Sequence, residues 1–462
     1  MQIEQEPNIN NIQATRRSNF LGKIFEYIFY FQCVFTIVLT SFFAIRGIFS
    51  NDDHHFHPVM WYPPSLTAIG VSAITAFLLQ SLTSRNPFKA MKAIFWFMSP
   101  IATILLGSLI ISVGNGAGFG TGILVVISGI VISLNGCRVI PRLAYAIDVL
   151  SHSLDHTPPK KNCIIFLAIL ASVFYSCFLV AGIGGIATTR TRIDEFVFVP
   201  VILLCQFWTM QVIKNVILVT VSRVNYKRFK NSTEFDTFVA LRETLRDSMG
   251  SICMGSISVP VFAAIYGFAQ TMKLLDVCCA NCCFGFASKL VSYGNRWGFV
   301  HVGEHRKGIV RASMDTLELL KGSQLEKVIG SDLNATLCFL CGVAGGSISG
   351  IAGGAWALAV HKSYVIQISL YAFLIGYYMG RIAMAWLHAS VMAYYVAFAE
   401  NPRSIVFLNS PIPGQIEDIR RLENASSSSR SQIREEFRQQ IRDQIEELVR
   451  TDDCNARREL NL

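Results

Sequence analysis

Charged residues are scarce in this sequence. Asp, Glu, Lys and Arg make up 15% of its 462 residues, whereas soluble globular domains carry about 25%. Hydrophobic residues reach 52% and the mean hydropathy is +0.43. This composition excludes a disordered chain, a secreted disulfide scaffold and a conventional soluble multidomain enzyme, and it predicts a protein embedded in a membrane.

Motifs of known catalytic chemistry are also lacking. The sequence holds no Walker A motif, no HExxH and no GxSxG in a strand–turn–helix setting. The glycine-rich stretch Gly342 to Gly354 falls inside a long apolar run, where small residues favour close helix packing or an unwound segment over phosphate binding. We therefore expect no enzyme activity, no catalytic residues, no cofactor and no metal.

The 13 cysteines do not form a disulfide framework, because most of them lie in apolar runs and pack as small hydrophobes. Packing also best explains the four cysteines between Cys278 and Cys283, with acylation and metal binding as alternatives. The three histidines between His54 and His57 follow Asp52 and Asp53, and this stretch is either a solvated turn or a metal-binding loop. The first 22 residues are polar, so we expect no cleaved signal peptide.

Long hydrophobic runs make up most of the sequence. A helix needs about 20 apolar residues to cross about 30 Å of hydrocarbon, and the sequence has nine clear candidates and one weak one, Leu274 to Val302, which contains Lys289, Asn295 and Arg296. The clear candidates are Ile24 to Ile48, Pro64 to Leu82, Met91 to Val113, Ala117 to Cys137, Cys163 to Ala187, Phe196 to Ser222, Ser251 to Met272, Leu333 to Val360, and Tyr364 to His388.

The distribution of Lys and Arg favours ten crossings. With the N-terminus inside, 22 basic residues fall in cytoplasmic segments and four outside, as the positive-inside rule requires. We expect an all-α polytopic membrane protein with about ten transmembrane helices and both termini cytoplasmic. Its parts are a cytoplasmic segment at 1–23, a transmembrane domain at 24–399 with cytoplasmic loops 138–161, 223–250 and 296–330, and a tail at 400–462 with an amphipathic helix at 431–450.

Polar residues within spans are costly and therefore informative. In the sixth span, Trp208, Gln211 and Asn215 fall near one helical face, with Lys214 beside them. In the last span the residues near a single stripe are Tyr371, Tyr378, Arg381, His388 and Tyr395. Both stripes predict a polar protein interior or cavity. The alternative is that Lys214 and Arg381 snorkel to the cytoplasmic interface while the tyrosines form an interfacial belt.

Four segments of the chain resemble the choline transporter-like family in order and spacing. They are FWTMQVIKNVILVTVS (Phe207 to Ser222), SMGSICMGSISV (Ser248 to Val259), NRWGFVHVGEHRKGIVRASMDTLELLK (Asn295 to Lys321) and AYYVAFAENP (Ala393 to Pro402). The chain is most similar to the short plant and fungal members, including the fungal pH-nine-sensitive type. After the NRW motif it departs from the family pattern and reads VGEHRKG. The resemblance implies a ten-span protein linked to uptake of choline or similar amines.

Recognition of choline would fall to aromatic rings, because a quaternary ammonium donates no hydrogen bond and each ring contributes about 0.5–2 kcal/mol. Carboxylates are almost missing from the middle of the spans. We therefore expect a uniporter, which a membrane potential of about 100 mV would drive to roughly fifty-fold accumulation of a monovalent cation. The expected substrate-binding residues are Trp208, Gln211, Asn215, Tyr371, Tyr378 and Trp386, and those expected to act structurally are Lys214, Arg381 and His388.

The expected partners are choline or a similar amine and the lipid bilayer, with no nucleic acid. The helix in the tail either docks on its own protein as a solvated surface helix or binds a protein partner or a second copy of the chain. We expect residence in the plasma membrane rather than in an endomembrane. The alternative function is that of a non-transporting membrane protein in lipid homeostasis, vesicle trafficking or scaffolding.

Overall fold

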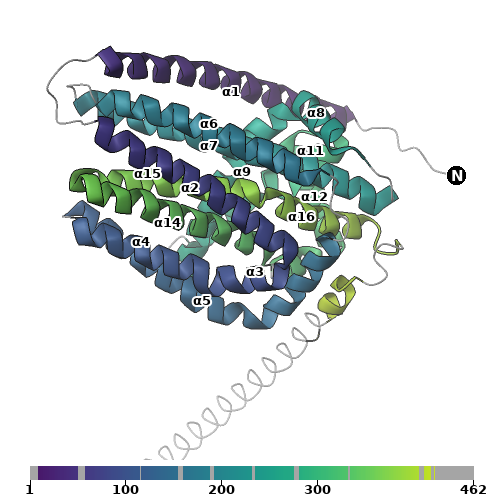
Figure 1. The fold of residues 1–462 in the computed structure, drawn as a ribbon. Helices are drawn as coiled ribbons and strands as arrows, with labels where there is room; N and C mark the ends of the chain where they lie inside the picture. The colour runs from purple at the N-terminus through teal and green to yellow at the C-terminus, as the bar shows by residue number, and fades with distance from the viewer. Residues whose placement is uncertain are drawn as a thin grey trace, which may run out of the picture. The chain divides into compact units, whose positions relative to one another are not determined.

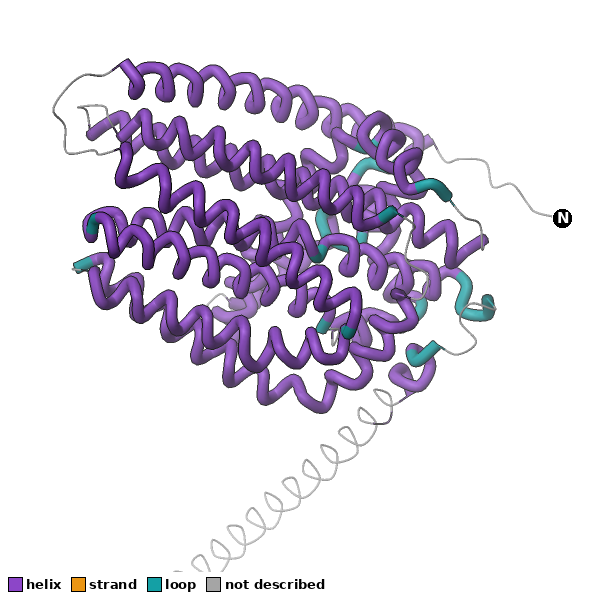
Figure 2. The backbone as a smooth tube through the Cα atoms, in the orientation of Figure 1, coloured by secondary structure: helices purple, strands orange, loops and turns teal. Residues whose placement is uncertain are grey.

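The structure is a computed structural model that describes residues 9–49, 58–114, 116–154, 160–187, 192–231, 235–274, 280–330, 333–404, 410–417 and 421. The described residues form helices and connecting loops, with no strand among them (Figure 2). This confirms the expected all-α class. The chain divides into two compact units, Met1–Ser410 and Pro411–Leu462. In the second unit residues 412–417 are helical, and the predicted amphipathic helix at 431–450 lies outside the described residues.

Nine helical stretches in the described part of the chain are long and apolar enough to cross a membrane. They lie side by side and nearly parallel in the first unit (Figure 1). They belong to α1 (Ile9–Phe49), α2 (Pro58–Arg85), α3 (Pro87–Ala93) with η1 (Ile94–Met98) and α4 (Ser99–Val113), α5 (Ala117–Leu154), α6 (Lys161–Ala187), α7 (Arg192–Asn231), α9 (Met249–Leu274), α14 (Asn334–Val360), and η2 (Lys362–Tyr364) with α15 (Val365–Ala383). The nine clear spans read from hydropathy are thereby confirmed.

The weak tenth candidate is a broken helix. Within it, α10 (Ala280–Tyr293) has 14 residues, which at 1.5 Å per residue cover about 21 Å, short of the hydrocarbon thickness. The chain then bends at Gly294, whose Cβ position would lie 2.8 Å from the Phe262 ring, and it resumes as α11 (Gly298–His305). A full crossing by this segment stays a prediction.

Short helices gather at the end of the bundle where α1 begins (Figure 1). They are α8 (Thr237–Asp247), α11 and α12 (Ile309–Gly322), followed by α13 (Leu325–Gly330). The predicted loops 223–250 and 296–330 are therefore largely helical. Ion pairs join these helices to each other and to α7: Arg223 with Glu243, Arg306 with Asp247 at 3.3 Å, and Lys307 with Asp315 at 2.6 Å.

Helices α14 and α15 approach each other through glycine. A Cβ atom at Gly376 would lie 2.6 Å from the carbonyl oxygen of Gly345, and one at Gly380 would lie 2.8 Å from the carbonyl oxygen of Cys341. No side chain fits at either position without separating the backbones. The close-packing interpretation of the glycine-rich stretch is confirmed, and α14 is a continuous helix through it.

The last predicted span is interrupted. Helix α15 ends at Ala383, Met384 lies in a turn, and α16 (Ala385–Glu400) follows. Every side chain from Ala385 to Phe398 is buried, and Asn225 of α7 donates a 2.7 Å hydrogen bond to the Ser390 hydroxyl of α16. The prediction that His388 continues the stripe of α15 is wrong, because His388 belongs to a second helix that is enclosed by the bundle.

Candidate functional site

The polar face of α7 points into the protein, toward α1 and α9. The Trp208 indole N–H donates to the carbonyl oxygen of Cys253 at 3.2 Å, and its ring meets that of Phe29 edge-on at 5.4 Å between centroids. The Asn215 amide donates to the Ser256 hydroxyl at 2.8 Å. Gln211 is 5% exposed. The structure thus gives Trp208 and Asn215 hydrogen bonds between helices.

An aromatic cluster forms where α7 meets α15. The Tyr378 ring is 6% exposed, and it lies edge-on to Phe207 at 5.7 Å and to Tyr377 at 5.3 Å. We call Phe207, Tyr377 and Tyr378 the aromatic cluster. Their faces and edges provide the kind of surface that attracts an ammonium group.

The Arg381 side chain points toward the preceding turn of its own helix. Its guanidinium donates a 2.8 Å hydrogen bond to the Tyr377 hydroxyl and lies 5.6 Å from the centre of that ring. Its aliphatic stem lies against Gly342 of α14. Arg381 thus packs between α14 and α15, which favours the structural interpretation over snorkelling.

Basic groups converge below the aromatic cluster. The charge of Lys214 on α7 interacts with those of Arg381 on α15 and Arg296 before α11. His388 on α16 interacts with the same groups and is 8% exposed. We call Lys214, Arg296, Arg381 and His388 the basic cluster. Among the described residues, the charges acting on His388 are all positive, so this part of the interior favours an anionic group.

Two predicted residues lie apart from this arrangement. Trp386 is fully buried on α16, and the Lys161 ammonium lies 4.0 Å above the centre of its ring. Tyr371 is half-buried on α15, about two turns before Tyr378. The structure therefore brings Tyr378, Lys214, Arg381 and His388 together. It places Trp208 and Asn215 against α9, and Trp386 against α6.

Sequence reasoning missed Phe207, Tyr377 and Arg296. Phe207 and Tyr377 each neighbour a residue that was singled out, and both fall just off the stripes drawn with an ideal helical period. From hydropathy, Arg296 only argues against a crossing by its segment. Its position in the family-like NRW motif was the available signal.

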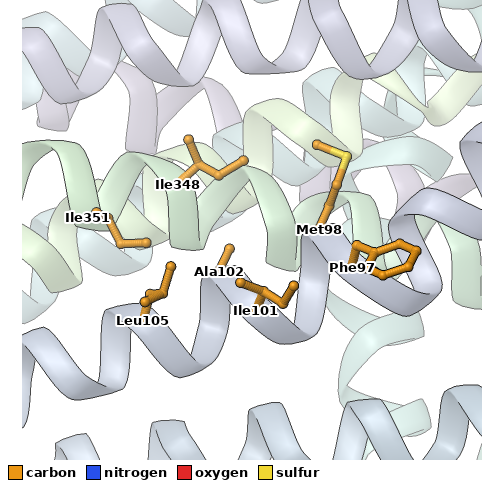
Figure 3. A pocket seen from close by; sticks show the side chains of 7 residues that line it. All are labelled: Phe97, Met98, Ile101, Ala102, Leu105, Ile348 and Ile351. Carbon is orange, nitrogen blue, oxygen red and sulfur yellow. The ribbon is translucent and has the colours of Figure 1, made fainter.

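An apolar groove of about 350 Å³ lies elsewhere, between α4 with η1 and α14. Side chains from the two sides point toward one another in Figure 3, and all of them carry only carbon and sulfur. The lining residues are Phe97, Met98, Ile101, Ala102, Leu105, Ile348 and Ile351. Without a polar group to orient a ligand, this groove suits a lipid acyl chain rather than an amine.

Comparison with known proteins assigns the class. The family model described as "Plasma-membrane choline transporter" matches residues 123–403, which is more than half of the chain. The chain belongs to the choline transporter-like family. It is a multi-pass membrane protein.

Fungal proteins named Protein PNS1 are similar to this chain. The one from Mycosarcoma maydis is 25% identical over 244 residues, which is 47% of this chain and 45% of that protein. The one from Debaryomyces hansenii is 23% identical over 249 residues, or 49% and 48% of the two chains. A CTL-like protein of Dictyostelium discoideum is 21% identical over 211 residues, or 42% and 38%. The match thus spans about half the length of these relatives or less.

Proposed function

We propose that this protein moves choline or a related organic cation across a membrane. The observation that carries the proposal is the family match over residues 123–403, which takes in every helix from α6 to α16 and most of α5. The plasma membrane is the proposed location, in keeping with the family's description.

Aromatic rings supply the proposed recognition. Tyr378 presents its ring beside Phe207 and Tyr377, and a desolvated ammonium on such rings gains about 2 kcal/mol per favourable contact. Gln211 and Tyr371 are proposed to border the same path. Trp208, Asn215 and Trp386 complete the proposed substrate-binding set, while Lys214, Arg381 and His388 are proposed to act structurally.

Uniport driven by the membrane potential is the proposed mechanism. Glu26 is the one carboxylate in the sequences of the nine candidate spans that the structure describes. A buried acid is the usual device for coupling to protons, and a cation entering a negative compartment needs none. A potential of about 100 mV contributes about 2.3 kcal/mol per charge.

The basic cluster favours a second candidate substrate. Lys214, Arg296 and Arg381 repel a bare cation, and they attract a phosphate or carboxylate. A molecule that carries both a quaternary ammonium and an anionic group would place the first on the aromatic cluster and the second on the basic cluster. Choline phosphate is the simplest probe of this class.

Flux into proteoliposomes tests the proposal. Purified protein is reconstituted with internal potassium, and valinomycin sets an inside-negative potential while labelled choline is outside. We expect uptake that rises with the potential and is absent from protein-free vesicles. Tyr378→Ala should lower this uptake at least tenfold, whereas Tyr30→Phe, at an exposed position on α1, should leave it unchanged.

Two results would contradict this assignment. Uptake of labelled choline phosphate without uptake of choline would support the second candidate. Absence of flux for either compound, with folded protein in the vesicles, would favour the alternative of a non-transporting protein in lipid homeostasis, trafficking or scaffolding.

A further inference from the structure

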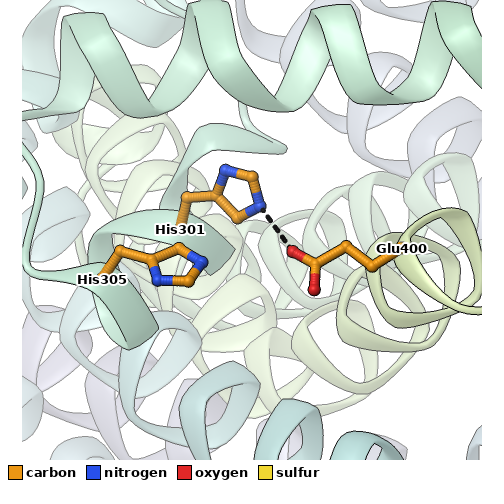
Figure 4. A group of neighbouring side chains, drawn as sticks. All are labelled: His301, His305 and Glu400. Carbon is orange, nitrogen blue, oxygen red and sulfur yellow. Dashed lines mark ion pairs between the residues drawn. The ribbon is translucent and has the colours of Figure 1, made fainter. Parts of the chain in front are cut away.

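Two histidines and a glutamate meet at the end of the bundle, away from the aromatic and basic clusters. His301 and His305 are four residues apart on α11, so they lie on one helical face. Glu400 is the last residue of α16. Figure 4 shows the Glu400 carboxylate facing the His301 ring, with His305 beside it. One ligand atom from each of the three lies within 4.8 Å of the others.

The distances suit a metal ion better than a hydrogen bond. His301 Nε2 and Glu400 Oε1 are 3.5 Å apart, which is long for a hydrogen bond. Two ligand atoms that share a tetrahedral zinc ion, each at about 2.0–2.2 Å from it, lie about 3.4 Å apart. Closing the third ligand onto the ion requires a shift of at most about 1.4 Å, and the exposed His305 side chain can rotate.

His301 is the decisive side chain. It is 5% exposed, and within the described residues neither of its ring nitrogens makes a hydrogen bond. A buried imidazole without hydrogen bonds is costly unless something binds it. Glu304, between the two histidines on the same helix, also has a buried carboxylate oxygen without a hydrogen-bond partner among the described residues.

The surroundings orient the glutamate. Glu400 Oε2 accepts hydrogen bonds from the Tyr226 hydroxyl and, at 3.0 Å, from Lys230, which leaves Oε1 toward His301. Hydrogen bonds of this kind to the outer oxygen typically fix metal-ligating carboxylates.

We propose that His301, His305 and Glu400 form a binding site for a zinc ion or a similar divalent transition metal, which ties α11 to the end of α16. Imidazole nitrogen with a single carboxylate selects such ions over magnesium or calcium, which prefer oxygen ligands. Three protein ligands leave a fourth position for water. Lys230 and Lys307 are the nearby cations, and Lys230 is 47% exposed, so it can turn to solvent when the ion enters.

Metal binding is measured on purified full-length protein carrying a non-histidine tag. After chelator treatment, zinc affinity is determined by competition with a chromogenic chelator, and cobalt is added in a parallel sample to record its visible spectrum. The variants are His301→Gln, His305→Gln and Glu400→Gln. His361→Gln is the matched control, because His361 is an exposed histidine outside the cluster.

Wild type and His361→Gln should each bind one equivalent of zinc tightly. In each of the three cluster variants the affinity for that equivalent should fall at least a hundredfold. Cobalt should give the intense bands of a four-coordinate site. Tyr226→Phe should keep the site but weaken it about tenfold, as loss of an orienting hydrogen bond does.

The number of zinc ions bound per chain distinguishes the proposed site from zinc bound by other histidines. The sequence also holds His54, His55 and His57, which lie outside the described residues, so a variant with all three changed to Gln is measured too. The proposal is overturned if that variant loses the tight equivalent while His305→Gln keeps it, or if wild type binds no zinc at micromolar concentration. Because the readout is metal content, the result does not depend on the transport activity proposed above.

Discussion

The side chain of Arg381 occupies the space that Gly342 leaves empty. A Cβ atom at Gly342 would lie 2.7 Å from Arg381 Cγ and 3.0 Å from the Tyr377 ring. The glycine-rich face of α14 therefore does two things. It allows α15 to approach closely, and it makes room for the arginine that contributes to the basic cluster.

Alanine at the tightest contacts of this interface should destabilise the bundle. In Gly376→Ala and Gly380→Ala the new methyl group meets backbone, which cannot move aside as a flexible side chain can. We expect each to lower the free energy of unfolding by about 1–3 kcal/mol, seen as a lower midpoint of thermal unfolding in detergent. Gly70→Ala on α2 is the control, because nothing lies within 4 Å of its Cβ position. Equal midpoints for Gly376→Ala and Gly70→Ala would contradict the close contact.

Removal of one positive charge from the basic cluster should strengthen choline transport. Lys214→Gln and Arg381→Gln each remove a repulsion of about 1 kcal/mol from the region below Tyr378, so we expect the choline KM to fall about fivefold. Arg381→Lys keeps the charge and should behave as wild type in this respect. A rise in the choline KM of both Gln variants, together with loss of choline phosphate uptake, would instead support the zwitterionic substrate.

Trp208 offers a test that separates substrate contact from packing. Trp208→Ala removes both the hydrogen bond to Cys253 and the ring contact with Phe29. If substrate also lies on this ring, as proposed, the choline KM should rise at least tenfold, because a desolvated cation–π contact contributes about 2 kcal/mol. Trp208→Phe keeps an aromatic face and should lose less. Trp96→Ala, at a partly exposed residue of η1, is the control. A lower unfolding midpoint with unchanged KM for Trp208→Ala would assign the residue to packing.

The topology predicts which loops are accessible on intact cells. An epitope tag after Gly322, at the exposed end of α12, should be protected from an impermeant antibody until the membrane is permeabilised. A tag after Asp53 should be accessible at once. Labelling of the Gly322 tag on intact cells would show that α10 and α11 do not complete a crossing, and that this cap of short helices lies outside.

Hydropathy was sufficient to find the nine long spans, because a helix in lipid must satisfy its own backbone and present apolar side chains along its whole length. It was not sufficient at Met384. The residues on either side of this break, Arg381 to Leu387, contain no proline or glycine, and their hydropathy continues across it. The interruption reflects how α16 packs against α7 and α5, and such long-range contacts leave no local pattern.

The polar face of α7 and the His301–His305–Glu400 group could be predicted from the sequence to different degrees. Amides on one face of α7 indicated a protein interior, since lipid does not accept them, and the burial of Gln211 and Asn215 confirms this. The helical period gives the direction of a side chain but not the neighbour it meets, so Phe207 and Arg296 were missed. His301 and His305 carry a readable i, i+4 spacing. Their third partner, Glu400, lies on a helix far along the chain, and only the fold brings it near.

The enclosed position of α16 has a consequence for biogenesis. Its side chains from Ala385 to Phe398 are buried, so this helix has no face to offer to lipid when it leaves the translocon. Its neighbours among the described helices are α5, α7, α11, α12, α14 and α15, all of which are synthesised earlier. A chain that stops before Met384 should therefore leave uncovered the surfaces of α5 and α7 that α16 packs against.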